Sequence, residues 1–255
     1  MEWSACKILC SLNNYLNKKV DECIICKLFS KFRGVNNILI EPLFLKKKSP
    51  IVQIESPKMK GQEYLAFNNL LSVKSWFRQN MQDLVRNLSK SEIQALNKYS
   101  GFKSLYINSY LRGKKLMEFS KSKEEIQEMI KNIQSAILKV STPVNLIAYR
   151  GASIKKIFGQ EIQNPERLVG KGIYDKGFMS VSLLEDVAKN FSTDVVLKIK
   201  IPKGTNLAFM GAISFFEKEG EILLNKGQKL IITKITQGKK DNKYEFECEL
   251  LEKQS

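Results

Sequence analysis

The spacing of hydrophobic residues changes at Pro143, and this change constrains the fold more than any other feature of the chain. Before Pro143, apolar residues recur every three to four positions, which is the spacing of amphipathic helices. After it, apolar and polar residues alternate, which is typical of strands with one buried face. We expect helices over residues 68–88, 89–99, 106–113 and 122–137.

Seven strands are expected after Pro143, over residues 144–149, 178–182, 195–201, 206–210, 221–224, 230–235 and 244–251. The helices come first and the strands afterwards, so the sequence predicts an α+β fold with a mixed, mostly antiparallel β core. The chain has no glycine-rich phosphate loop of the dinucleotide-binding or nucleoside-triphosphatase type. A doubly wound parallel sheet is therefore not expected.

The first 60 residues are predicted to form an N-terminal extension, with the main domain over residues 61–255. Pro50 and Pro57 mark a connector between the two parts. The extension is predicted to be helical. Its function is left open between a secretion or targeting segment, contact with an anionic membrane or a delivery partner, and helices that cover the main domain.

Four of the five cysteines crowd this extension, at Cys6, Cys10, Cys23 and Cys26. Such spacing is compatible with a four-thiolate zinc site. The intervening residues are apolar, however, and no glycine or proline marks a zinc knuckle. Free thiols packed on helices are the favoured interpretation, and no metal is expected.

The charge and the missing histidines limit the possible functions. Lys and Arg outnumber Asp and Glu by 42 to 26, giving a net charge of +16, which favours polyanionic partners or reflects lysine-rich codon usage. The absence of histidine excludes histidine triads, histidine-ligated zinc hydrolases and imidazole acid–base catalysis. No membrane-spanning stretch and no typical signal peptide is expected.

Three motifs carry residues suited to glycosyl transfer. Arg150 ends the predicted strand LIAYR, Ser180 lies in FMSVS, and Glu219 and Glu221 flank a glycine before ILL. A carboxylate held against a sugar stabilises the positive charge that develops when a glycosidic bond breaks. A guanidinium binds phosphate through paired hydrogen bonds.

Together with the helical motif YINSYLRG, these motifs resemble, in order, those of mono-ADP-ribosyltransferase toxins with an Arg, a Ser-x-Ser and a Glu-x-Glu signature. The resemblance covers about residues 68–251. It is strongest to the catalytic domains of clostridial and bacillary actin-modifying toxins and to the Rho-modifying exoenzymes. It implies a two-sheet β core, NAD as substrate and no metal.

The resemblance also implies roles for the matched residues. Glu221 would hydrogen-bond the ribose, Ser180 would orient Glu221, and Arg150 would bind the pyrophosphate. Further contacts to NAD are implied for Gly151, Asn108, Arg112 and Arg167. Residues 158–174 would correspond to a mobile loop over the nicotinamide.

Glu219 is implied to select the acceptor, and a glutamate at this position predicts an arginine. Phe215 and Phe216 are predicted to recognise a protein substrate, although at least one of them is expected to pack in the core. Two departures from the family pattern stand out. Val181 replaces the usual threonine of Ser-Thr-Ser, and the second arginine that some relatives carry after Arg150 is missing.

The predicted function is therefore transfer of ADP-ribose from NAD to an arginine of a host protein, with actin the first candidate and a small GTPase the second. Two alternatives remain: an NAD glycohydrolase, and a basic binding module without activity. We expect a monomer that is secreted or translocated and acts in the host cytoplasm. No nucleic-acid partner is expected.

Overall fold

The computed structural model describes residues 63–81, 86–114, 122–211, 213, 218–238 and 243–251. The predicted extension over residues 1–60, its cysteines and the domain boundary near residue 61 lie outside this part of the chain. Within the described residues, no helix has the length and apolar character needed to cross a bilayer.

The helices that precede the sheet are α3 (Leu70–Asn80), α5 (Lys90–Lys98), α6 (Ser104–Leu111) and α7 (Lys123–Leu138). Their first turns are closed by side chains of Asn69, Ser89 and Ser122 in α3, α5 and α7, and the predicted capping box of α5 is present. Helix α3 ends at Asn80, so it is shorter than the helix expected over residues 68–88. Gly101, with ψ of −148°, interrupts the π-helical turn η1 (Tyr99–Lys103) between α5 and α6.

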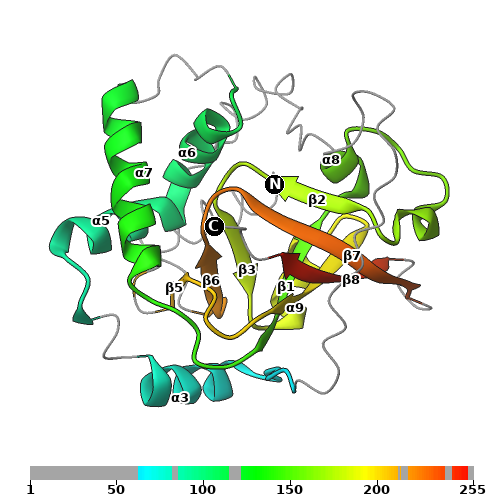
Figure 1. Cartoon of the computed structure of the whole chain (residues 1–255), viewed down its shortest axis with the longest axis horizontal. Helices are drawn as coiled ribbons and strands as arrows, with labels where there is room; N and C mark the ends of the chain where they lie inside the picture. The colour runs from blue at the N-terminus through cyan, green and yellow to red at the C-terminus, as the bar shows by residue number, and fades with distance from the viewer. Residues whose placement is uncertain are drawn as a thin grey trace, which may run out of the picture. The chain divides into compact units, whose positions relative to one another are not determined.

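In the described ranges, eight strands form one sheet in the order β2–β7–β8–β4–β1–β3–β6–β5 (Figure 1). Every pairing is antiparallel except that of β4 with β8. The predicted mixed, mostly antiparallel core is therefore confirmed. The strands are β1 (Leu146–Ala152), β2 (Gly172–Asp175), β3 (Met179–Ser182), β4 (Val195–Ile201), β5 (Leu207–Phe209), β6 (Glu221–Leu224), β7 (Gln228–Gln237) and β8 (Tyr244–Leu251).

The division into two separate sheets is not found, because the hydrogen-bonded ladder is continuous. Its narrowest point lies between β1 and β3, which share the single register pair Tyr149 and Ser182. By contrast, β1 pairs with β4 along its whole length. The pairing between the β3–β6–β5 part and the rest of the sheet is therefore confined to this short junction.

Four short elements were not expected from the sequence: α8 (Ile154–Phe158), η2 (Pro165–Leu168), β2 and α9 (Glu185–Phe191). The segment predicted as a mobile loop, residues 158–174, contains η2 and most of β2. That this segment moves over the nicotinamide stays a prediction. Strand β2 exists because it pairs with β7, a long-range contact that local periodicity does not report.

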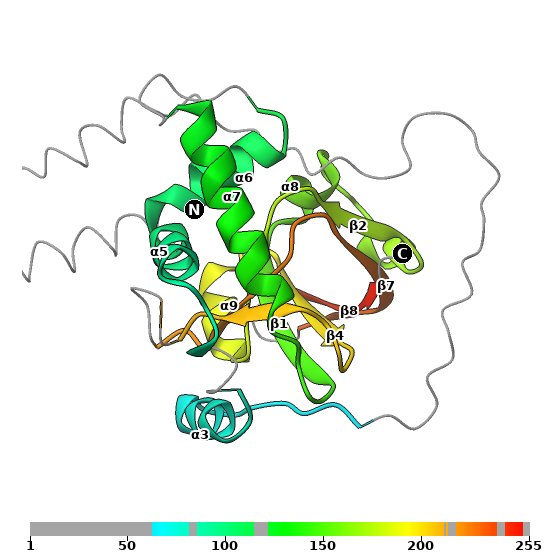
Figure 2. The ribbon, with the colours of Figure 1, turned by 60° about the vertical axis from the view of Figure 1, so that its left-hand side comes forward.

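Strand β6 separates two hydrophobic cores. Ile222 and Leu224 pack with Val73 and Phe77 of α3, whereas Leu223 packs with residues of α5 and α7. Successive strand side chains point to opposite faces, so α3 and the α5–α7 group cover opposite faces of β6. Figures 1 and 2 show α5, α6 and α7 gathered together, with α3 lying apart from them.

Glu92 joins α5 to α7. Its carboxylate accepts hydrogen bonds from the backbone of Ser89, from the hydroxyl of Ser135 (2.7 Å) and from Nζ of Lys139 (2.8 Å). Burial of Glu92 acts to raise its pKa, but these hydrogen bonds outweigh it and lower the pKa to about 2. The ionised form of Glu92 therefore stabilises the helical layer.

We predict that Glu92→Gln lowers the free energy of unfolding at pH 7 by about 2 kcal/mol, because it removes hydrogen bonds to a charged group. The depressed pKa means that this contribution is present above pH 4.5 and is lost as the pH falls towards about 2. Denaturant unfolding at several pH values measures the difference. Exposed Glu128→Gln on α7 is the control, with a change within about 0.5 kcal/mol. Equal effects of the two variants would contradict the prediction.

Candidate functional site

Strands β3 and β6 bring the Ser-x-Ser and Glu-x-Glu motifs together. Their antiparallel register pairs Ser180 with Leu223 and Ser182 with Glu221. Because Leu223 faces the α5–α7 core, Ser180 and Glu221 lie on that same face of the sheet. The hydroxyl of Ser180 donates a hydrogen bond to the carboxylate of Glu221.

Ser182 fixes the turn that carries the two glutamates. Its Oγ donates to the carbonyl of Glu219 at 2.6 Å and accepts from the amide of Leu184 at 2.9 Å. The amide of Leu183 donates to the carbonyl of Gly220 at 3.0 Å. Gly220 adopts a φ of +55°, which favours glycine. The backbone on both sides of the turn is therefore anchored to the end of β3.

Arg150 lies beside a buried carboxylate that the sequence did not single out. Its Nη1 donates to the carbonyl of Ser180 at 2.9 Å, and its Nη2 lies 3.9 Å from Asp175. Asp175 is 2% exposed and also accepts two hydrogen bonds from Arg112, at 2.9 and 2.8 Å, and one from the amide of Gly177. Burial raises the pKa of Asp175, but these partners outweigh it and hold the pKa below its usual value.

Helix α6 reaches the same region through Asn108. Its Oδ1 accepts from the amide of Phe178, and its Nδ2 donates to the hydroxyl of buried Tyr99, both at 2.9 Å. Tyr99 also hydrogen-bonds Ser180. Burial of Tyr99 raises the pKa of its hydroxyl group to about 12. A Cβ on Gly177 would lie 2.7 Å from Oδ1 of Asn108, so this contact requires glycine.

Most of the predicted site residues therefore come together: Arg150, Ser180, Glu219, Glu221, Asn108 and Arg112. The sequence reasoning missed Tyr99, Asp175 and Gly177. The sequence Asp175-Lys176-Gly177 directly before the Ser-x-Ser strand was an available signal, because Asp and Gly are both typical of turns. Arg112 is paired with Asp175 in the structure, and its contact with NAD stays a prediction.

Burial controls the acidity of both glutamates. The pKa of Glu221 is raised to about 7, and burial is the largest cause. The hydrogen bond from Ser180 acts to lower this pKa, the charge of Glu219 acts to raise it, and the charge of Arg150 acts to lower it. Burial likewise raises the pKa of Glu219. Because the folded protein holds the Glu221 proton more tightly than the unfolded chain does, stability decreases as the pH rises from 4.5 through about 7.

Gly151 lies directly against the backbone of α9. A Cβ at this position would lie 2.1 Å from the carbonyl oxygen of Ala188 and 2.5 Å from the amide of Ser192. The close approach that this glycine allows is that of α9 to β1. A role beside NAD stays a prediction.

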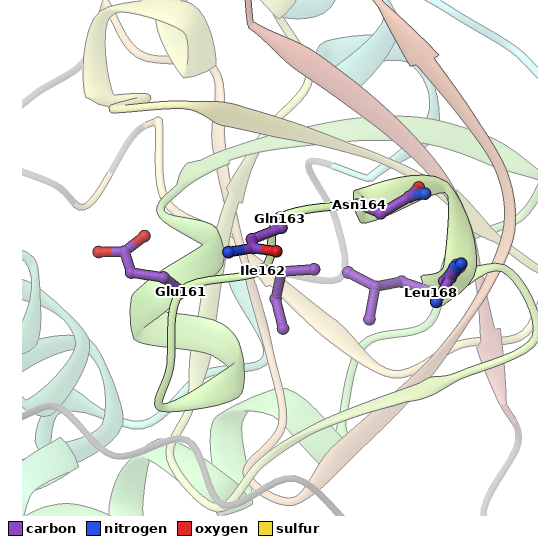
Figure 3. A pocket seen from close by; sticks show the side chains of 6 residues that line it. Glu161, Ile162, Gln163, Asn164 and Leu168 are labelled. Carbon is purple, nitrogen blue, oxygen red and sulfur yellow. The ribbon is translucent and has the colours of Figure 1, made fainter.

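Arg167 lines a pocket in the segment between α8 and β2. Figure 3 shows this pocket with the side chains of Glu161, Gln163 and Asn164 labelled. The structure does not bring Arg167 into hydrogen-bonding or ion-pair contact with Arg150, Ser180 or Glu221 within the described residues.

Phe215 and Phe216 lie outside the described part of the chain. Among the residues described, no three acidic or cysteine side chains are grouped as metal ligands. The pocket is lined by Glu161, Ile162, Gln163, Asn164, Arg167 and Leu168.

The model of the ADP-ribosyltransferase exoenzyme family matches residues 73–253, which include every strand of the sheet. The chain belongs to this family. NAD(+)–arginine ADP-ribosyltransferase EFV of Enterococcus faecalis is 29% identical over 155 residues, covering 58% of this chain and 30% of that protein. Mono-ADP-ribosyltransferase C3 of a Clostridium botulinum C phage is 26% identical over 186 residues, covering 67% of this chain and 74% of the relative.

The fold of this exoenzyme domain is also found in solved structures. The ADP-ribosylating toxin BECa of C. perfringens, solved with NADH, superposes with a TM-score of 0.64 at 27% identity, covering 74% of this chain and 50% of that one. The chain spans about a third of the length of the first curated relatives that it matches. The described β core thus has the fold of the family.

We predict opposite pKa shifts of Glu221 in two variants. Ser180→Ala removes a hydrogen bond to the ionised form and raises the pKa above about 7, whereas Glu219→Gln removes a like charge and lowers it. Carbon-13 NMR titration of the glutamate side chains measures both shifts. The wild-type pKa should be near 7, and two shifts in the same direction would contradict the arrangement.

A second prediction concerns Asp175. Asp175→Asn leaves two arginines without their buried counter-charge, so we expect the free energy of unfolding to fall by about 3 kcal/mol or more. The exposed pair of Lys155 and Glu161 is the control, and Glu161→Gln should change stability by less than about 1 kcal/mol. Denaturant unfolding at pH 7 compares them. A small effect of Asp175→Asn would show that the cluster does not depend on this carboxylate.

Proposed function

We propose that the chain is an NAD-dependent mono-ADP-ribosyltransferase that modifies an arginine of a protein. One observation carries this proposal: Glu219 and Glu221 lie two residues apart on a turn fixed by Ser182, beside Ser180 and Arg150. Membership of the exoenzyme family supports the reaction class. The relative from E. faecalis, named as an NAD–arginine ADP-ribosyltransferase, supports the acceptor.

Glu221 is proposed to stabilise the transition state. When the bond between the ribose C1′ and nicotinamide breaks, nicotinamide leaves with the electron pair and positive charge develops on the ribose. An ionised carboxylate held by Ser180 stabilises that charge most strongly in a partly dehydrated site. Tyr99, which also interacts with Ser180, is proposed to help orient the carboxylate through this serine.

Arg150 is the proposed partner of the NAD pyrophosphate. It is 26% exposed, whereas Arg112 is 11% exposed and uses Nε and Nη2 on Asp175. Arg112 therefore acts through Asp175, which holds it and Arg150 in one cluster. This arrangement leaves Arg150 as the more accessible guanidinium for a phosphate.

Glu219 is proposed to act on the acceptor. A guanidinium is protonated in water and must lose a proton to attack the ribose. The new bond joins the guanidino nitrogen to C1′, and the proton passes to Glu219. Burial raises the pKa of Glu219, which makes it a better proton acceptor than an exposed glutamate.

The target and the place of action are proposed from the family resemblance. Actin is the first candidate and a small GTPase the second, in the cytoplasm of a host cell after secretion or translocation. NAD glycohydrolysis is a second candidate activity, because the charge stabilisation assigned to Glu221 does not require a protein acceptor.

We predict that Glu221→Gln reduces both nicotinamide release and protein labelling by about 100-fold or more, because it removes the charge opposite the developing cation. Glu219→Gln should abolish labelling and leave nicotinamide release within about threefold. Incubation of host-cell lysate with NAD labelled in its adenosine half measures both. Parallel loss in the two variants would contradict separate roles. Nicotinamide release without labelling by the wild type would assign a glycohydrolase, and neither activity would overturn the proposal.

A further inference from the structure

Asn108 of α6 has both ends of its side chain in hydrogen bonds to other parts of the protein. Its Oδ1 accepts from the amide of Phe178, and its Nδ2 donates to the hydroxyl of Tyr99, both at 2.9 Å. A backbone amide can only donate, so it must face the oxygen of the asparagine side chain and not the nitrogen. This requirement fixes which atom of Asn108 meets Tyr99.

The hydrogen bonds beyond Asn108 form a chain that has one direction. An amide nitrogen donates and does not accept, so the oxygen of Tyr99 accepts from Asn108 and its single proton goes to a further partner. Tyr99 hydrogen-bonds Ser180, whereas the carbonyl of Phe178 lies 3.5 Å from the hydroxyl, beyond the usual range for such a donor. Ser180 is therefore the favoured acceptor of this proton.

The last bond of the chain ends on the carboxylate of Glu221. A serine hydroxyl has one proton, and because the oxygen of Ser180 accepts from Tyr99, that proton is directed to Glu221. Hydrogen bonds in such a series polarise one another, which strengthens the bond to the ionised carboxylate. Tyr99 is 1% exposed, and burial raises the pKa of its hydroxyl to about 12, so the hydroxyl remains a donor at neutral pH.

We infer that Asn108 is a positioning residue for the cleavage of NAD, which acts through Tyr99 and Ser180 on the carboxylate of Glu221. This inference rests on the proposed transferase function. It gives Asn108 a role other than the contact with NAD that the family resemblance implies. The two roles predict different kinetics, because loss of a contact with NAD raises KM, whereas loss of the chain lowers kcat at unchanged KM.

The test uses the full-length protein and measures the rate of nicotinamide release from NAD, with the small guanidino compound agmatine as acceptor. Tyr99→Phe removes only the hydroxyl, and Asn108→Ala removes the first donor of the chain. The double variant shows whether one residue acts through the other. Tyr110→Phe is the matched control, because it also removes a hydrogen-bonded tyrosine hydroxyl, one whose partner is Gln127 of α7 at 2.8 Å.

We expect Tyr99→Phe and Asn108→Ala each to lower kcat by about 10-fold, because the carboxylate is less firmly placed against the ribose. The KM for NAD should stay within about threefold, which also shows that the NAD site is still formed. The double variant should be slower than the slower single variant by no more than about twofold. Tyr110→Phe should match the wild type in kcat and KM.

The pH profile provides a readout that a loss of stability alone would not move. The acid limb of kcat/KM reports the pKa of an essential carboxylate in the free enzyme. We expect this limb to move to higher pH in both single variants, because the hydrogen bond to the ionised form of Glu221 is weakened. The charges of Glu219 and Arg150, which also act on Glu221, are the same in every variant.

Three results would overturn the inference alone. A higher KM without a fall in kcat in Asn108→Ala would show that Asn108 binds NAD directly. An unchanged kcat in Tyr99→Phe would show that the chain is not needed. Losses that multiply in the double variant would show that the two residues act independently. Wild-type protein that releases no nicotinamide, with agmatine or with host-cell lysate, would instead overturn the proposed function, and the inference with it.

Discussion

The pairing of β3 with β6 is the constraint on which the rest of the site depends. It sets Ser182 opposite Glu221 and Ser180 opposite Leu223. A shift of one residue would turn Glu221 towards the core shared with α3 and would place Ile222 where the site requires a carboxylate. The apolar residues of β6 are buried on both faces and oppose such a shift. Hydrophobic packing therefore determines where the carboxylate of Glu221 lies.

The site concentrates buried charge and balances it unevenly. Asp175 is stabilised in its ionised form by two arginines, whereas burial destabilises the ionised forms of Glu219 and Glu221. The ionised form of Asp175 therefore adds to the stability of the fold, whereas ionisation of Glu219 and Glu221 lowers it. A strongly shifted pKa at a buried carboxylate is typical of functional positions, where stability is often given up for activity.

Periodicity and capping residues were sufficient to predict the helix-then-strand order, the capping box at Ser89 and the extents of β4, β6 and β8. They failed for β2 and α9, which are short and depend on contacts with distant segments. Motifs identified the residues of the site but not their supports. The residues around Asp175 indicate a turn but not its arginine partner, and no local pattern marks Tyr99. The contacts of these two residues are with partners 63 and 79 positions away, Arg112 and Phe178.

The two glutamates are held by different means, and this difference matters for their roles. Glu221 belongs to β6, so the pleat of the sheet sets the direction of its side chain. Glu219 precedes Gly220, whose positive φ breaks that pleat. Its position is set instead by the turn, whose carbonyls at Glu219 and Gly220 accept hydrogen bonds from Ser182 and Leu183. A change in the conformation of this turn would therefore move Glu219 more readily than Glu221, which is held in the sheet.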